Sequence, residues 1–140
     1  MHNLLALVTL AILLLFVFMM VRVGRARGQY NVPAPATTGA PEFERHFRVH
    51  ANTLEGLIMF LPALWLFSLG LDNLLDSLLG DLIGSGLGVI WIIGRVIYMV
   101  SYVRDPGTRS AGFGIQGLAT VVALLGGVVV SVLALVKVGL

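Results

Sequence analysis

Four polar side chains share one face of a segment that is otherwise apolar. They are Arg45, Arg48, Asn52 and Glu55, which form a single stripe at about 100° per helical residue. The segment continues into residues 56–65 without a turn signal, so these groups enter an apolar helix. Arginine binds carboxylates through paired, charge-assisted hydrogen bonds, and a carboxylate accepts an ammonium group. The stripe therefore suits a small anion that also carries an amine.

A second stripe at helical spacing carries Arg95, Tyr98 and Tyr102. Ionisable groups in a membrane helix are costly and usually face the protein interior, so the two stripes predict a pocket between helices. Alternatives remain open, because Glu55 and Arg95 can also neutralise each other as a structural ion pair, and the tyrosines also fit an interfacial aromatic belt. His50 points away from the polar face and contributes to a site only if that face meets another chain.

The composition is that of an integral membrane protein. The chain is 58% apolar and 11% charged. Its 140 residues allow one domain of four spans, at about 20 residues for each span. It has no cysteine, and His46 and His50 have helical ligand spacing without a third ligand, so we expect no metal site. The net charge of +2 gives no indication of nucleic acid binding.

Four apolar stretches predict an all-α bundle of four transmembrane helices in a single domain over residues 1–140. The predicted helices run from about residue 3 to 23, 42 to 70, 82 to 103 and 110 to 136. We expect the first to be a retained helix rather than a signal peptide, because it is long, no basic residues precede it, and Arg22 and Arg25 follow it. Pro62 is expected to kink the second helix.

The distribution of charge predicts the orientation of the helices in the membrane, and the glycines predict how closely the helices pack. Basic residues flank the first and third connections and acidic residues the second, so both basic connections are expected in the cytoplasm. The third helix carries glycines at four-residue spacing, and the fourth carries several more, which predicts close helix packing. These glycines are Gly80, Gly84 and Gly88, followed by Gly112, Gly114, Gly117, Gly126 and Gly127.

Two blocks of sequence resemble the MAPEG family, the membrane-associated proteins of eicosanoid and glutathione metabolism. The first runs from Pro-Glu-Phe-Glu-Arg at residues 41–45 through Arg48, Asn52 and Glu55 to residues 60–65. The second joins Gly-Arg-Val-Ile-Tyr at residues 94–98 to Arg-Asp-Pro-Gly-Thr-Arg at residues 104–109. The resemblance implies a homotrimer with glutathione bound between subunits. The third connection is similar to that of bacterial members, which implies a bacterial inner membrane and a site facing the cytoplasm.

The resemblance also assigns residues by position. It implies that glutathione contacts Arg48, Asn52 and Glu55 of the second helix, Arg95, Tyr98 and Tyr102 of the third, and also Arg27 and His50. Arg109 stands seven residues after Tyr102, where the leukotriene-forming member has the arginine that activates the thiol. Gly56 departs from that member, which has tyrosine there, and this argues against the leukotriene-forming activity.

The implied function is a membrane-bound glutathione transferase, with possible peroxidase activity on lipid hydroperoxides. Glutathione is the co-substrate, and the lipophilic electrophile arrives from the membrane lipids. Arg109 is the catalytic candidate, because a cation beside the sulfur favours the thiolate. The alternatives are a noncatalytic lipid- or glutathione-binding member and a small multidrug transporter with Glu55 as its proton-coupled carboxylate. The arginines around the pocket mouth argue against the export of cations.

Overall fold

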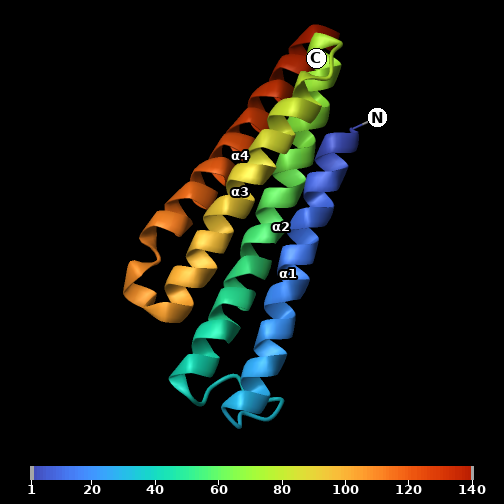
Figure 1. Cartoon of the computed structure of the whole chain (residues 1–140). Helices are drawn as coiled ribbons and strands as arrows, with labels where there is room; N and C mark the ends of the chain where they lie inside the picture. The colour runs from blue at the N-terminus through green and yellow to red at the C-terminus, as the bar shows by residue number, and fades with distance from the viewer. Residues whose placement is uncertain (1, 140) are drawn as a thin grey trace.

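The computed structural model describes residues 2–139, which form four long helices (Figure 1). They are α1 (Asn3–Gln29), α2 (Pro41–Leu75), α3 (Leu79–Arg104) and α4 (Ser110–Val138), with a short 3₁₀ helix, η1 (Pro106–Thr108), between α3 and α4. The helices lie side by side and alternate in direction (Figure 1). Each is long and apolar enough to cross a membrane. The predicted all-α arrangement of four long apolar helices is confirmed, and the number of subunits stays a prediction.

The first helix is longer than predicted, ending at Gln29 rather than near residue 23. Its basic residues end the apolar stretch but not the helix, because arginine is a good helix former and Arg27 in the last turn suits the negative end of the helix dipole. The chain turns at Asn31, whose φ of 53° is left-handed. Asparagine tolerates this conformation better than most residues.

The second helix ends in the same way. Asp76, with φ 48° and ψ 50°, follows Leu75 in the left-handed conformation, and its backbone N–H donates to the Asp72 carbonyl. Only residues 76–78 separate α2 from α3, which begins at Leu79. Pro62 lies on an exposed face inside α2, and the helix continues on both sides of it.

The core runs along the centre of the bundle. Phe60 of α2 and Trp91 of α3 stack with their ring centres 5.0 Å apart and an angle of 6° between the rings. Leu5, Ile12 and Leu64 belong to the same buried cluster. The outer faces of the helices carry large apolar side chains, as expected of a surface in contact with lipid tails.

Glycines let the helices approach closely where the third helix meets its neighbours. A Cβ added at Gly80 or Gly84 would collide with Ser68 of α2, and one added at Gly88 would collide with Val8 of α1. The predicted close packing at these three positions is therefore confirmed. On α4 the prediction holds only in part, because Gly114 and Gly117 face open space.

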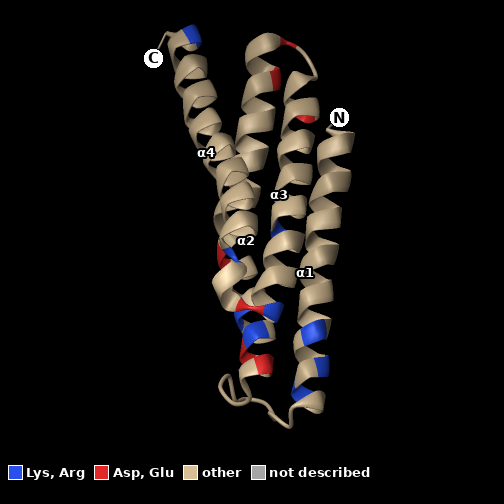
Figure 2. Cartoon of the chain, turned by 60° about the vertical axis from the view of Figure 1, so that its left-hand side comes forward, with Lys and Arg blue, Asp and Glu red and all other residues tan. Residues whose placement is uncertain are grey.

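Charge is distributed unevenly along the bundle. Figure 2 shows most lysine and arginine residues at the end that holds the α1–α2 and α3–α4 connections, whereas aspartates mark the α2–α3 connection at the opposite end. Lys137, in the last turn of α4, is the exception on the acidic side, where its Nζ donates to the backbone carbonyl of Leu74 at the end of α2. This is the asymmetry from which the topology is predicted.

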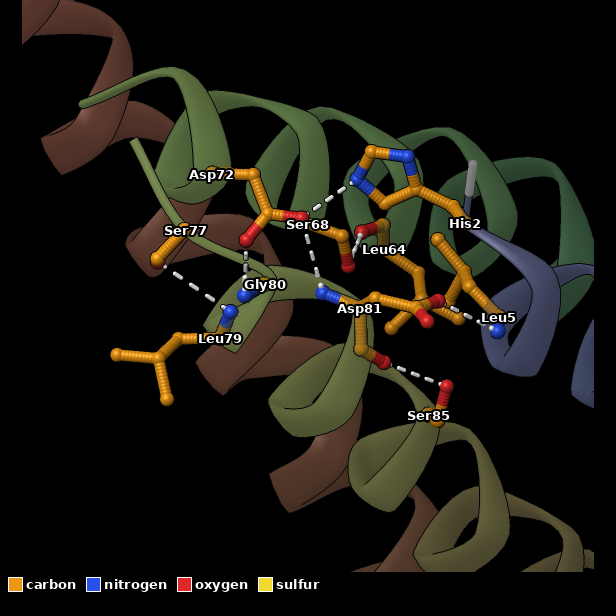
Figure 3. Close-up of polar contacts among 10 residues, drawn as sticks. All are labelled: His2, Leu5, Leu64, Ser68, Asp72, Ser77, Leu79, Gly80, Asp81 and Ser85. Atoms are coloured by element: carbon orange, nitrogen blue, oxygen red, sulfur yellow. Dashed lines mark hydrogen bonds and ion pairs between the residues drawn. The ribbon is translucent and has the colours of Figure 1, made fainter. Parts of the chain in front are cut away.

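Two buried carboxylates stabilise the acidic end, and each accepts hydrogen bonds from the first turn of a helix other than its own (Figure 3). Asp72 of α2 accepts hydrogen bonds from the backbone N–H groups of Gly80 and Asp81 in the first turn of α3. Asp81 in turn accepts from the backbone N–H of Leu5 in the first turn of α1, at 2.9 Å. Carboxylates at helix N-termini accept hydrogen bonds from unpaired N–H groups, and their negative charge interacts favourably with the positive end of the helix dipole.

His2 completes this cluster, although the sequence gives it no evident role. Its Nε2 lies 2.6 Å from Oδ2 of Asp72, and its ring is 6.4 Å from that of Trp65, centre to centre. His2 is therefore part of the packing at this end of the bundle. The contact ties the start of α1 to the end of α2, 70 residues later in the chain.

Candidate active site

A polar cavity of 920 Å³ opens near the basic end of the bundle, between α2, α3 and the start of α4. Its walls combine arginines, tyrosines, an asparagine and a carboxylate with small and apolar residues. The lining residues are Arg48, Ala51, Asn52, Glu55, Tyr98, Tyr102, Pro106, Gly107, Arg109, Ser110 and Phe113. Six residues assigned from the sequence therefore lie around a single cavity.

The α2 wall is built by helical spacing. Arg48, Asn52 and Glu55 are four and three residues apart, which places them on one face of the helix. Asn52 is half-buried, whereas Arg48 and Glu55 are exposed in the single chain. No described residue forms an ion pair with Glu55, since the contact of His2 with Asp72 is the one ion pair within residues 2–139. The alternative in which Glu55 and Arg95 neutralise each other as an ion pair is therefore not found among these residues.

Arg95 pairs with Asn52 instead. Its Nη1 and Nη2 donate to Oδ1 of Asn52 at 3.1 and 3.2 Å, and Nη2 also donates to the Asn52 backbone carbonyl at 2.9 Å. Arg95 is fully buried and lies outside the residues that line the cavity. The sequence therefore places Arg95 on the correct stripe, but the structure sets it behind the pocket wall.

On the opposite side, two tyrosine rings are stacked between two guanidinium groups, of which Arg109 lines the cavity and Arg95 lies behind its wall. The Arg95 guanidinium carbon lies 4.7 Å from the centre of the Tyr98 ring, and the Tyr98 and Tyr102 rings are 5.4 Å apart. The Arg109 guanidinium carbon lies 5.8 Å from the centre of the Tyr102 ring, at the other end of the stack. Cation–π contacts favour these positions, so both tyrosine rings are fixed between two guanidinium groups.

A tight turn brings Arg109 to the cavity. α3 ends at Arg104, and the Asp105 carboxylate accepts from the backbone N–H of Gly107 at 2.9 Å. Thr108 Oγ1 donates to the Asp105 carbonyl at 2.8 Å. These bonds form the 3₁₀ turn, after which α4 begins at Ser110. Arg109 therefore projects from the entrance to α4, and no periodicity within one helix predicts its position.

Two residues assigned by resemblance lie away from this cavity in the single chain. Arg27 donates to the backbone carbonyls of Val32 at 3.3 Å and Ala36 at 2.7 Å, so it holds the α1–α2 connection together. His50 stacks on Phe16 of α1 with ring centres 4.7 Å apart. Neither lines the pocket of its own chain. A role in binding glutathione stays a prediction that needs a second copy of the chain.

Arg45 shares the stripe of α2 but has a different task. Its Nη1 donates to the backbone carbonyls of Val103 at 3.3 Å and Arg104 at 3.2 Å. The last carbonyls of a helix have no intrahelical partner, and a basic side chain satisfies them well. Arg45 therefore anchors the end of α3 that supports the turn before Arg109.

Sequence reasoning missed Ser110 and Phe113. Phe113 lies four residues after Arg109 and so shares its face of the helix, whereas Ser110 is its neighbour in the chain at the start of α4. Phe113 also approaches Tyr98, with ring centres 6.4 Å apart. The helical spacing from Arg109 was the available signal. Within residues 2–139, no group of three or more His, Cys, Asp or Glu side chains is arranged to hold a metal ion.

Comparison with known proteins agrees with this arrangement. Residues 5–129 match the MAPEG family. The chain belongs to the MAPEG family. It is therefore an integral membrane MAPEG protein with four candidate spans.

Individual MAPEG relatives differ in what their names say. An uncharacterized protein of Synechocystis is 38% identical over 121 residues, which cover 86% of this chain and 82% of the relative. Human microsomal glutathione S-transferase 2 is 35% identical over 109 residues, or 75% of this chain and 69% of the relative. Leukotriene C4 synthase of Cavia porcellus is 34% identical over 108 residues, or 77% and 67%. The second is named as a glutathione transferase, and the third is named as the synthase of leukotriene C4.

Proposed function

We propose that this MAPEG protein is a membrane-bound glutathione transferase, which uses glutathione as a thiolate against lipophilic electrophiles. The observation that carries the proposal is the meeting of Arg109 with Arg48, Asn52 and Glu55 around one cavity. Arg109 directly precedes α4, and the other three residues come from the N-terminal half of α2. Similarity to a microsomal glutathione S-transferase over 75% of the chain supports the same chemistry.

The cavity has the charges that glutathione needs. At neutral pH the tripeptide carries two carboxylates and one ammonium group. Arg48, Asn52 and Arg109 supply donors for the carboxylates and the peptide carbonyls, and Glu55 supplies an acceptor for the ammonium. The cavity volume of 920 Å³ falls within the range of about 300–1,000 Å³ that is usual for small-molecule sites.

Arg109 is the group that promotes thiolate formation. A free thiol has a pKa of about 8.5 and is mostly protonated at neutral pH, whereas the thiolate is the nucleophile. A guanidinium group keeps its charge even when partly desolvated, so it stabilises the thiolate beside it and lowers the thiol pKa. Tyr102, held under Arg109, offers a hydroxyl donor to the same sulfur.

The reaction then forms one bond and breaks another. The thiol proton leaves to water, and the thiolate sulfur attacks the electrophilic carbon of the second substrate. A sulfur–carbon bond forms, and the leaving group departs with its electron pair. With a lipid hydroperoxide the thiolate sulfur attacks the terminal oxygen, so that a sulfur–oxygen bond forms, the oxygen–oxygen bond breaks, and the lipid alcohol leaves with a proton from water. A second glutathione then attacks the sulfur of the resulting sulfenic acid, which forms the disulfide and releases water.

We further propose that the active form is a homotrimer with its sites facing the cytoplasm. Arg48 and Glu55 are exposed on a face of a helix that can cross a membrane, where contact with lipid is costly. A neighbouring copy that covers this face removes that cost and closes the cavity. The same contact would bring Arg27 and His50 of a neighbour toward the site, and the basic end of the bundle predicts the cytoplasmic side (Figure 2).

The direct test is conjugation by the purified protein in detergent, with chlorodinitrobenzene as the electrophile. We expect turnover that saturates with glutathione and is retained by Arg104→Ala, since Arg104 is exposed and lies outside the cavity. Folded protein that shows no turnover with this electrophile or with a lipid hydroperoxide would contradict the proposal. Glutathione binding without turnover would instead identify a noncatalytic member.

A further inference from the structure

Arg95 is a buried cation without a buried counter-charge. Its relative exposure is 0%, and no carboxylate of residues 2–139 lies within ion-pair distance. Its guanidinium carbon lies between the rings of Trp91, at 5.5 Å from the ring centre, and Tyr98, at 4.7 Å. Three hydrogen bonds join it to a single residue, Asn52. Desolvation of a charge is costly, so a buried arginine whose hydrogen bonds all go to one neutral residue needs an explanation.

The bonds fix which way the Asn52 amide points. Oδ1 accepts from both Nη1 and Nη2 of Arg95, at 3.1 and 3.2 Å, so both lone pairs of this oxygen are used. Rotating the amide by half a turn would place its NH2 group against the guanidinium donors and remove both bonds. The side chain therefore keeps its oxygen toward Arg95 and its nitrogen on the other side.

The amide nitrogen is left for a ligand. Asn52 lines the cavity, and no residue within 2–139 accepts a hydrogen bond from its Nδ2. Arg95 does not line the cavity, and packing holds it in place. A Cβ added at Gly56 would already lie 3.3 Å from Nη2, so little room remains beside the guanidinium group.

We propose that Arg95 is a positioning residue, which locks Asn52 as a hydrogen-bond donor to an acceptor oxygen of the bound tripeptide. This inference rests on the proposed function. The acceptor is a carboxylate or a peptide carbonyl of glutathione, since the ammonium and the N–H groups of the tripeptide are donors. Arg95 therefore acts through Asn52 rather than by touching glutathione, which differs from the role that the family resemblance implies for it.

A double-mutant cycle on glutathione affinity tests this route of action. Arg95→Lys keeps the charge but cannot hold the two Asn52 oxygens in a fork, and Asn52→Asp keeps acceptors for Arg95 but has no donor for the ligand. We expect each variant to weaken glutathione binding by about tenfold or more, measured by calorimetry on the detergent-solubilised protein. The matched control is Arg25→Lys, the same replacement on an exposed side chain, which should leave the affinity unchanged.

The combination of the two changes decides the question. If Arg95 acts through the Asn52 amide, Arg95→Lys has no further effect in the Asn52→Asp background. Fold-changes that multiply would overturn the inference, because Arg95 would then contact the ligand by its own route. The turnover at saturating glutathione should change less than the KM, whereas an equal fall of kcat and kcat/KM would assign Arg95 to the chemical step.

The position of the acceptor follows from a second ligand. γ-Glutamylcysteine lacks the glycine and its carboxylate. If Asn52→Asp lowers the affinity for this dipeptide as much as it lowers the affinity for glutathione, the acceptor lies in the γ-glutamylcysteine part. If the loss is confined to glutathione, Asn52 donates to the glycine end. An unchanged affinity for both ligands would overturn the donor role.

A readout without any ligand separates this inference from the proposed function. Protein labelled with ¹⁵N-asparagine shows the side-chain NH2 signals of four asparagines. The pair of signals that belongs to Asn52 is the pair that is lost in Asn52→Asp. We expect the Asn52 signals of the ligand-free protein to move in Arg95→Lys and to stay in place in Arg25→Lys. Unmoved signals would overturn the inference even if the protein is a transferase. Moved signals in a protein that binds no glutathione would overturn the proposed function and glutathione as the ligand of Asn52, and would leave the orientation of Asn52 by Arg95 intact.

Discussion

Arg109 and Tyr102 lie on opposite sides of a chain reversal, yet the guanidinium carbon of Arg109 is 5.8 Å from the centre of the Tyr102 ring. Tyr102 is in the last turns of α3, and Arg109 comes directly before α4. The turn between them is held by the side chains of Asp105 and Thr108. The contact places a permanent cation at the wall of a cavity whose other charges come from α2.

The first prediction concerns Arg109. Arg109→Ala should lower kcat/KM for conjugation by about tenfold for each unit by which the guanidinium lowers the thiol pKa, since one unit corresponds to about 1.4 kcal/mol. The pH–rate profile should move toward higher pH, because the thiolate then forms closer to the pKa of free glutathione. Arg104→Ala is the matched control. Retention of full activity and an unmoved profile by Arg109→Ala would remove Arg109 from the mechanism.

The second prediction concerns Glu55 as the acceptor of the glutathione ammonium group. Glu55→Gln should lower the affinity for glutathione by about tenfold, because a charge-assisted hydrogen bond is lost. A glutathione analogue that lacks the amino group should bind native protein and variant alike. Calorimetry with both ligands provides the comparison. An equal loss with the two ligands would show that Glu55 acts on the arginines or on the fold instead of on the ammonium.

The third prediction concerns the packing of α3 against α4 beside the site. A Cβ added at Gly112 would collide with the backbone of Gly94 and Tyr98, whereas one added at Gly114 meets open space. Gly112→Ala should therefore destabilise the protein by about 1–3 kcal/mol through overpacking. Gly114→Ala should be neutral or slightly stabilising, since alanine favours helix by up to about 1 kcal/mol.

Heat inactivation in detergent gives the measurement for this pair, because unfolding of a membrane protein is rarely reversible. The half-life of Gly112→Ala should shorten and that of Gly114→Ala should not. Similar half-lives for the two variants would show that the helices can separate slightly at no cost. Activity before heating should fall only in Gly112→Ala, because the displaced backbone carries Tyr98.

The fourth prediction concerns the buried cluster at the acidic end (Figure 3). Asp72→Asn leaves one acceptor for the N–H groups at the start of α3 and removes the charge that faces His2, so it should cost about 1–3 kcal/mol of stability. Asp76→Asn is the control, because Asp76 is exposed and asparagine tolerates its left-handed backbone. Thermal half-lives again give the comparison. Equal half-lives would mean that the cluster is not a structural anchor.

The sequence predicts most of the fold, because four apolar stretches of membrane length leave few other arrangements. It places the end of α1 too early. Arg22, Arg25 and Arg27 end the hydropathy signal while they extend the helix to Gln29. Apolarity reports where lipid tails end, whereas hydrogen bonding and the left-handed Asn31 determine where the helix ends.

Some residues of the candidate site can be placed from the sequence, and others cannot. Helical spacing alone places Arg48, Asn52 and Glu55 together, since one helix carries all three. Spacing cannot place Arg109, which depends on the shape of a turn, and only the family resemblance assigns it. Glu55 was one of the alternatives considered as the partner of Arg95, and the partner is Asn52, because a match of charges does not determine which polar group a buried guanidinium reaches.

The cluster at the acidic end could not be predicted from the sequence. Asp72 and Asp81 flank a short connection, where aspartates are usually solvated. Their role follows from tertiary packing, which brings the starts of α1 and α3 onto these carboxylates. His2 has no local pattern that reveals its contact with Asp72, since the two residues are 70 positions apart.

Thiolate formation on the protein tests the central claim most directly. Ultraviolet difference absorbance is recorded as glutathione is added at neutral pH to the purified protein, with a sulfur-free glutathione analogue as the blank. We expect a saturable thiolate signal in native protein and in Arg104→Ala, and its loss in Arg109→Ala. Glutathione that binds native protein at this pH without any thiolate signal would rule out thiol activation by this site.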